Sequence, residues 1–271
     1  MWKRLRYVVM VYALICGLYF TYQHLLYFQP KALDLNHVLT YPVQLRTASS
    51  KIPYDANTLI DVVKFKPLDS TKEIKGVVLF FHGNRFNVEH YSTYAPYFTR
   101  NGFEVWMPDY PGFGRSTGEI QMIILNELSV QLYKMARLTF EPDQIVIYGK
   151  SLGTGVASYL ASVRDCRHLL LETPYYSLSS LTQAYLPFVP VPQLIKYNLK
   201  TGEYFKEIAA PITVLAAEED KLIPLGNTLR LIPEMKNTDA FYVVKSASHN
   251  SLPASDTYHR ILDSVLQRSF W

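Results

Sequence analysis

The chain has 271 residues, 49% of them hydrophobic, which suits one large domain with a short appendage. Its formal net charge of +4 matches the four basic side chains Lys3, Arg4, Arg6 and Lys31, because residues 1–31 contain no acidic side chain. The other residues carry 23 basic and 23 acidic side chains, which excludes an electrostatic argument for nucleic-acid binding.

An apolar run without a charged side chain extends from residue 7 to residue 28, interrupted by Gln23 and His24. As one helix, it is long enough to span roughly 30 Å of hydrocarbon. We therefore expect a transmembrane helix at about 7–28 within an N-terminal membrane anchor of residues 1–30. Cys16 lies inside this run and cannot reach Cys166, so we expect no disulfide framework.

Two alternatives to an uncleaved signal anchor remain open. A cleaved signal peptide needs small residues after the apolar run, and residues 22–29 offer none. A buried helix of the domain fits poorly with the basic residues that precede the run. For an anchor, the positive-inside rule puts the N-terminus in the cytoplasm and the catalytic domain on the non-cytoplasmic side.

Residues 31–271 alternate apolar strands with helical patterns. The expected strands are 37–46, 58–66, 76–81, 103–107, 144–148, 168–171, 211–217 and 241–245. The expected helices are 87–100, 120–140, 152–163, 224–235 and 253–270. Continuous apolar strands between helices predict an α/β fold with a mostly parallel central sheet and helices on both faces.

Residues 175–210 break this alternation. Three prolines punctuate the segment, and bulky apolar residues persist through it. We expect a small helical lid at about 175–210; the alternative, a structural excursion that covers the edge of the sheet, is compatible with it.

Residues 149–153 read Gly-Lys-Ser-Leu-Gly and fit the pattern Gly-x-Ser-x-Gly between a predicted strand and a predicted helix. Such a tight turn presents its serine hydroxyl to a substrate, and the glycines avoid steric conflict with neighbouring elements. The pattern makes Ser151 a candidate nucleophile. An ordinary strand-to-helix turn has the same local sequence, so further residues must decide.

A serine hydroxyl needs a base, and a histidine base needs a carboxylate to orient it. Asp220 and His249 follow Ser151 in the order nucleophile, acid, base, and each comes just after a predicted strand. His82 and Glu172 are the weaker candidates, and we assign them structural work. Glu218 and Glu219 also compete with Asp220, which stands four residues before Pro224.

An oxyanion needs preorganised N–H donors. The backbone N–H of Leu152, directly after the serine, is one candidate. The backbone N–H of Asn84, in the His-Gly-Asn sequence after the strand at 76–81, is the other. We expect no metal and no cofactor to be needed.

These motifs resemble the α/β-hydrolase superfamily, and most closely its membrane-anchored Bem46-like branch, which includes the α/β-hydrolase domain-containing 12, 13 and 17 proteins. The resemblance runs from about residue 74 to the C-terminus. It is carried by the motifs at 81–84, 109–118, 149–155, 220–224 and 249–250. The chain departs from the family pattern at Arg85 and Phe86, where small residues are common, and at Ala217 and Ser248, where glycines are common.

The resemblance implies a serine hydrolase that cleaves carboxylic ester or thioester bonds, often of lipids. It implies Ser151 as nucleophile, Asp220 as acid, His249 as base, and Asn84 and Leu152 at the oxyanion hole. A serine aminopeptidase-like peptidase and an acyltransferase on the same residues remain alternatives. An alternative of another class is a non-catalytic, membrane-tethered binding protein. The expected partners are a small acyl ester or lipid substrate and a membrane.

Overall fold

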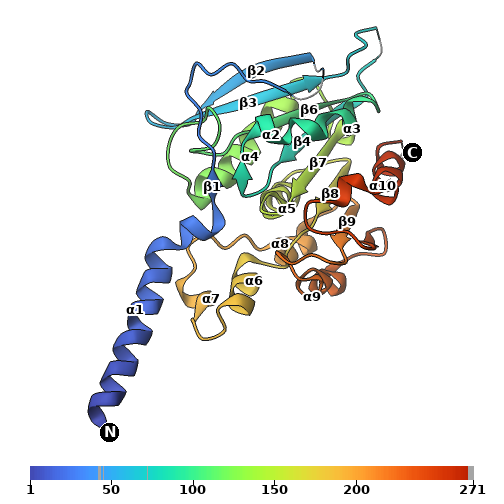
Figure 1. The fold of residues 1–271 in the computed structure, drawn as a ribbon. Helices are drawn as coiled ribbons and strands as arrows, with labels where there is room; N and C mark the ends of the chain where they lie inside the picture. The colour runs from blue at the N-terminus through green and yellow to red at the C-terminus, as the bar shows by residue number, and fades with distance from the viewer. Residues whose placement is uncertain (42–43, 45, 72, 268–271) are drawn as a thin grey trace.

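The computed structural model describes residues 1–41, 44, 46–71 and 73–267. An eight-stranded sheet has the order β10-β9-β8-β7-β4-β6-β3-β2 (Figure 1). Its strands are β2 (Arg46–Pro53), β3 (Leu59–Lys66), β4 (Gly76–Phe81), β6 (Phe103–Pro108), β7 (Ile145–Lys150), β8 (His168–Glu172), β9 (Ile212–Ala217) and β10 (Ala240–Val244). β3 runs antiparallel to β2 and β6, and the other pairs are parallel. This confirms the predicted α/β fold class.

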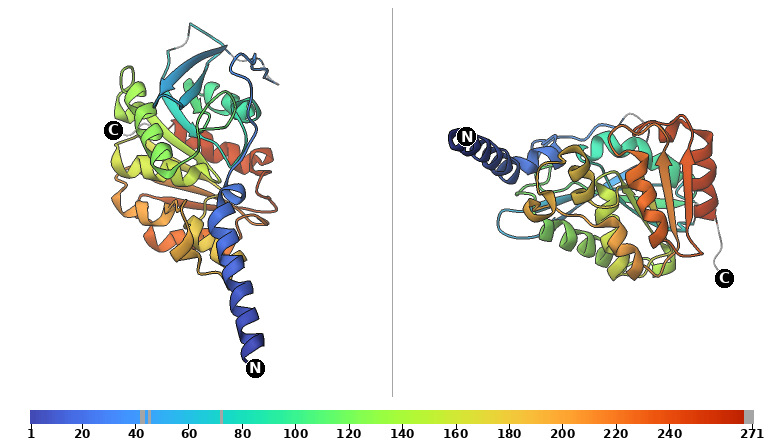
Figure 2. Two further views of the ribbon diagram at one scale, coloured as in Figure 1. Left: turned by 90° about the vertical axis from the view of Figure 1, so that its left-hand side faces the viewer. Right: turned by 90° about the horizontal axis from the view of Figure 1, so that it is seen from below.

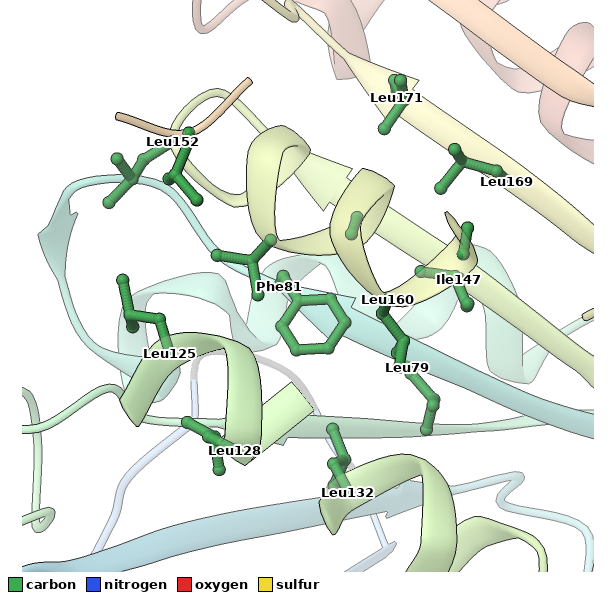
Figure 3. Packing of buried hydrophobic residues seen from close by; sticks show 14 of the residues in the cluster. Leu79, Phe81, Leu125, Leu128, Leu132, Ile147, Leu152, Leu160, Leu169 and Leu171 are labelled. Atoms are coloured by element: carbon green, nitrogen blue, oxygen red, sulfur yellow. The ribbon is translucent and has the colours of Figure 1, made fainter. Parts of the chain in front are cut away.

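Buried side chains point alternately to the two faces of the sheet, and helices cover both faces. In β4, Val77, Leu79 and Phe81 belong to one core cluster, and Val78 and Phe80 belong to the cluster on the opposite face. The first cluster includes side chains of α4 (Met122–Ala136) and α5 (Gly153–Val163), as Figure 3 shows. The second includes side chains of α2 (Val88–Tyr91), α3 (Ala95–Thr99) and α10 (Asp256–Gln267).

The segment 175–210, which we expect to form a lid, contains three short helices. They are α6 (Leu178–Tyr185), α7 (Val191–Leu194) and α8 (Thr201–Tyr204). α1 (Trp2–Tyr27) projects from the body beside α6 and α7 (Figures 1 and 2). It is the helix among the described residues that is long and apolar enough to cross a membrane.

The strand predicted at 37–46 is wrong. Residues 37–41 and 44 are not in a strand, positions 42, 43 and 45 lie outside the described residues, and the strand that pairs with β3 begins at Arg46. The apolar residues Leu39 and Tyr41 pack against the second core cluster without forming a strand, and the Tyr41 ring centroid lies 5.4 Å from that of Phe65. β2 is mostly exposed, so it has no apolar pattern to reveal it.

Two predicted helices are interrupted. The segment 87–100 divides into α2, a 3-10 turn at Ser92–Tyr94, and α3, in which Pro96 stands in the first turn. The segment 224–235 holds α9 (Leu225–Thr228) followed by a 3-10 helix that contains Pro233. Residues 268–270 of the last predicted helix lie outside the described residues.

A small two-stranded parallel sheet was not expected. β1 (Gln29–Pro30) follows α1 directly and pairs with β5 (Arg85–Phe86), which follows Asn84. The segment after the apolar helix therefore lies against the loop at the end of β4.

Candidate active site

Ser151 stands in a strained turn between β7 and α5. Its φ of 50° lies in the left-handed region, which a residue with a side chain occupies at a cost. A Cβ on Gly149 would lie 2.6 Å from the carbonyl oxygen of Gly153, so the turn has no room for a side chain there. The Ser151 N–H donates to the Glu172 carbonyl oxygen at 2.9 Å, which ties the turn to β8.

The structure brings Ser151, His249 and Asp220 into one chain of hydrogen bonds. The His249 Nε2 lies 2.9 Å from Ser151 Oγ, and its Nδ1 lies 2.7 Å from Asp220 Oδ2. With the proton on Nδ1, the ring donates to Asp220 and accepts from the serine hydroxyl. The three residues follow β7, β9 and β10 at the carboxyl ends of parallel strands.

The Asp220 carboxylate is held on both oxygens. Its Oδ1 accepts from the backbone N–H groups of Leu222 and Ile223, each at 2.8 Å, and Oδ2 faces His249. Asp220 and His249 are both 8% exposed. A carboxylate with these fixed donors can orient the imidazole and stabilise a positive charge on it.

Asn84 and Leu152 lie beside the serine. Both line the same cavity as Ser151 and His249, and Leu152 is the N-cap residue of α5. The positive end of a helix dipole favours a negative charge at this place. His82 stands at the base of the loop, where its Nδ1 lies 2.8 Å from the Gly83 carbonyl oxygen and its own carbonyl accepts from the Tyr110 hydroxyl at 2.9 Å.

The cavity has a volume of about 390 Å³ and is largely apolar. α1, β1, the turn at Ser151, the lid and the loops after β4, β9 and β10 contribute its described lining. Those residues are Leu26, Tyr27, Gln29, Asn84, Arg85, Ser151, Leu152, Tyr175, Leu178, Leu181, Thr182, Tyr185, Leu186, Leu222, Ile223 and His249. They include no acidic side chain, so the described wall offers no carboxylate to a peptide amine.

A buried ion pair behind the serine was not anticipated. Lys150 Nζ lies 2.5 Å from Glu172 Oε1, and the same oxygen accepts from the Tyr94 hydroxyl at 3.1 Å. Glu172 also accepts from the Tyr148 hydroxyl. The pairing follows from the register of β7 with β8, which places Lys150 opposite Glu172. The sequence signal was a lysine and a glutamate at the ends of two apolar strands.

Among the described residues, no group of three or more His, Cys, Asp or Glu side chains is arranged to hold a metal ion.

The comparison with protein families finds the α/β-hydrolase fold over residues 76–174. An uncharacterised protein of Mycobacterium tuberculosis is 27% identical over 151 residues, which cover 55% of this chain and 54% of that protein. The lysophosphatidylserine lipase ABHD12 of Danio rerio is 28% identical over 176 residues, covering 56% of this chain and 46% of the lipase. The α/β-hydrolase domain-containing protein 17C of Xenopus tropicalis is 24% identical over 197 residues, which cover 70% of this chain and 60% of that protein.

The chain thus spans about half of the length of the first relatives that it matches. Among solved structures, the Pyrococcus furiosus esterase Pf2001 superposes with a TM-score of 0.66 at 16% identity, covering 89% of this chain and 98% of the esterase. At this identity the likeness concerns the fold. The chain therefore has the α/β-hydrolase fold and is similar, at modest identity, to α/β-hydrolase domain-containing proteins.

Proposed function

We propose that this chain is a serine hydrolase that cleaves carboxylic ester or thioester bonds of lipid-like or other acyl substrates. The observation that carries the proposal is the hydrogen-bonded chain of Ser151, His249 and Asp220, whose serine and histidine line an apolar cavity. The names of two similar proteins, a lipase and an esterase, point to the same reaction class.

In this mechanism the Ser151 oxygen attacks the acyl carbonyl while His249 accepts its proton. The backbone N–H groups of Leu152 and Asn84 stabilise the oxyanion, and Asp220 stabilises the imidazolium. Collapse of the tetrahedral intermediate expels the alcohol or thiol, which takes the proton from His249. Water activated by His249 then cleaves the acyl-enzyme and restores the serine.

The cavity supports an ester over a peptide substrate. Its described lining contains many aliphatic and aromatic side chains and no acidic one, which suits an acyl chain rather than a charged amine.

We also propose an anchor at residues 1–30 and a hydrolase domain at 31–271 with its lid at about 175–210. Because α1 carries basic residues at its start and exposes most of its apolar side chains, we propose that it crosses a membrane with the domain on the non-cytoplasmic side.

The test combines a fluorophosphonate probe with p-nitrophenyl esters of graded acyl length. Wild type should react with the probe, and Ser151→Ala should lose both labelling and at least about 1000-fold of ester hydrolysis, because the nucleophile is gone. Ser162→Ala, in the last turns of α5, is the matched control and should keep both activities. Equal labelling of Ser151→Ala and wild type would refute the proposal.

A further inference from the structure

Gln23 is a buried polar residue in a mostly exposed apolar helix. It is 1% exposed, and its amide is paired at both ends with the lid backbone. Its Nε2 donates to the Leu194 carbonyl oxygen at 3.0 Å, and the Lys196 N–H donates to its Oε1 at 2.7 Å. A buried amide without partners is costly, so these two bonds select one position and rotation of α1 against the lid.

Tyr27 extends this contact by one helical turn. Its hydroxyl is 2.8 Å from Thr182 Oγ1 in α6 and 2.9 Å from the Tyr19 hydroxyl. Tyr19, Gln23 and Tyr27 are spaced four residues apart, so they share one face of α1. Leu26, Tyr27 and Thr182 all line the cavity that contains Ser151. The last turn of α1 is therefore a wall of that cavity.

β1 continues the contact from the cavity wall to the loop that carries Asn84. The Gln29 N–H donates to the Asn84 carbonyl oxygen at 2.8 Å, and the Lys31 N–H donates to the Phe86 carbonyl oxygen at 3.2 Å. The Asn87 side chain closes the connection by donating to the Lys31 carbonyl oxygen at 3.0 Å. Three hydrogen bonds thus hold the loop after β4 from the side of α1.

We propose that α1 and β1 are a working part of the active site as well as an anchor. Gln23 and Tyr27 are positioning residues for the lid, and they make α1 the surface against which a long acyl chain binds. The backbone of Gln29 positions the loop that supplies an oxyanion donor. The inference rests on the proposed ester hydrolysis. It assigns chain-length selection to the contact of Gln23 and Tyr27 with the lid. It assigns the rate of the chemical step to the contact of Gln29 with the loop that carries Asn84.

The first test replaces the buried amide in the full-length protein, purified in detergent micelles. Gln23→Leu replaces the polar amide with an apolar side chain of similar size and removes both hydrogen bonds to the lid. We expect KM for p-nitrophenyl dodecanoate to rise about tenfold, while kcat/KM for p-nitrophenyl acetate stays within about twofold, because an acetyl group is too short to need the α1 wall. His24→Leu, on the exposed side of α1, is the matched control and should change neither value.

The second test removes one backbone donor. Gln29→Pro lacks the N–H that reaches Asn84, and Gln29→Ala keeps it while losing the same side chain. We expect Gln29→Pro to have a kcat about tenfold or more below that of Gln29→Ala for both esters, with similar KM values. The reason is that the Gln29 N–H positions the loop of Asn84, whose own N–H stabilises the oxyanion mainly in the transition state. Asn87→Ala weakens the same connection without a proline and should lower kcat for both esters by a smaller factor.

Three results are distinguishable. The expected split supports the inference: KM for the long ester responds to Gln23, and kcat for both esters responds to the Gln29 N–H. If wild type hydrolyses both esters but Gln23→Leu keeps the wild-type KM for dodecanoate and Gln29→Pro matches Gln29→Ala, the inference is overturned and the proposed function stands. If wild type hydrolyses neither ester and does not react with the fluorophosphonate probe, both proposals fall.

Discussion

Lys150, the residue before the proposed nucleophile, forms a buried ion pair with Glu172. The side chains of Lys150 and Glu172 are 5% and 0% exposed, and Lys150 Nζ also lies 3.4 Å from the carbonyl oxygen of His249. The pair thus connects the turn at Ser151 with the segment that carries the proposed base. Removing one partner of a buried pair leaves the other charge without compensation.

We therefore expect Lys150→Met to lower the free energy of unfolding by about 3–5 kcal/mol. Urea denaturation followed by tryptophan fluorescence measures the change. The double variant Lys150→Met/Glu172→Gln removes both charges and should recover much of the loss. A single variant as stable as wild type would show that the pair contributes nothing to the fold.

His82 and Asp109 form a second buried pair, and burial favours the neutral form of each. Burial raises the pKa of Asp109 to about 8 and lowers the pKa of His82 to about 4. Asp109 Oδ1 lies 3.6 Å from His82 Nε2 and accepts from the Val88 N–H at 2.8 Å. The pair supports the loop that carries Asn84.

These pKa values predict how stability depends on pH. From about pH 4 to 6.5, unfolding lets His82 bind a proton, so its contribution to stability rises with pH, while that of Asp109 falls. From pH 6.5 to 8 the Asp109 effect remains: the folded state retains a proton that the unfolded state has lost. The free energy of unfolding should therefore fall across this interval, by up to about 1.4 kcal/mol per pH unit.

Urea titrations of wild type and Asp109→Asn at pH 6.5, 7.0, 7.5 and 8.0 test this pH dependence. The asparagine does not ionise, so its curve should be flatter than that of wild type. A wild-type curve that stays parallel to that of Asp109→Asn would contradict an Asp109 carboxyl that is neutral at pH 7.

At the scale of single residues, the proposed catalytic set was predictable because each member follows an apolar strand. Ser151, Asp220 and His249 stand where parallel strands end, and those ends meet at one edge of a sheet. The Lys150–Glu172 pair was not predictable, because it depends on β7 and β8 being neighbours in register. Gln23 was visible as an interruption of the apolar run, but its partners in the lid lie 171 and 173 positions away.

The strand-to-helix turn at Ser151 is the element on which the site depends. α5 begins at Gly153, and a Cβ there would lie 2.1 Å from the Phe81 carbonyl oxygen and 2.7 Å from that of His82. Both contacts are with backbone, which cannot rotate away. The close approach of α5 to the end of β4 brings the serine beside the loop that carries Asn84.

Gly153→Ala should therefore separate α5 from the end of β4. We expect it to lower the free energy of unfolding by about 1–3 kcal/mol and to reduce ester hydrolysis by a larger factor than stability alone explains. Gly226→Ala, in α9, is the matched control: nothing lies within 4 Å of the added Cβ, and it should stabilise the fold by up to about 1 kcal/mol. Calorimetric melting and p-nitrophenyl ester hydrolysis provide the readouts. Equal effects of the two substitutions would refute the packing argument.

Element boundaries were predictable where burial is continuous and failed where it is not. β4 was located to the residue because all six of its residues are buried. β2 was misplaced because its mostly exposed side chains carry no apolar pattern, while nearby apolar residues pack on the core without forming a strand. Proline interrupts α-helical geometry in the segments 87–100 and 224–235, and the surrounding packing accommodates shorter turns there.

Viewed as a whole, the molecule is an α/β body with one projecting apolar helix (Figures 1 and 2). The proposed orientation puts the body on the non-cytoplasmic side of a membrane. Asp69→Asn tests it, because it creates the glycosylation acceptor Asn-Ser-Thr in the exposed loop after β3. Expressed in a eukaryotic cell, this variant should gain a glycan that endoglycosidase H or peptide N-glycosidase F removes.

The control for this topology test carries Asp69→Asn together with Thr71→Ala, which keeps the first change and destroys the acceptor. It should run as the unglycosylated protein on a denaturing gel. A folded, membrane-bound Asp69→Asn protein without a glycan would contradict a non-cytoplasmic domain.

The sequence alone determined the fold class, the order of most elements and the residues proposed for catalysis. Those features depend on local patterns: continuous apolar strands, glycines at a tight turn, and polar residues placed just after strands. The tertiary structure decided which distant segments meet, because hydrogen bonds between them depend on strand register and on the docking of α1. It thereby placed Lys150 against Glu172, Gln23 against the lid and Gln29 against Asn84, joining the predicted anchor to the proposed active site.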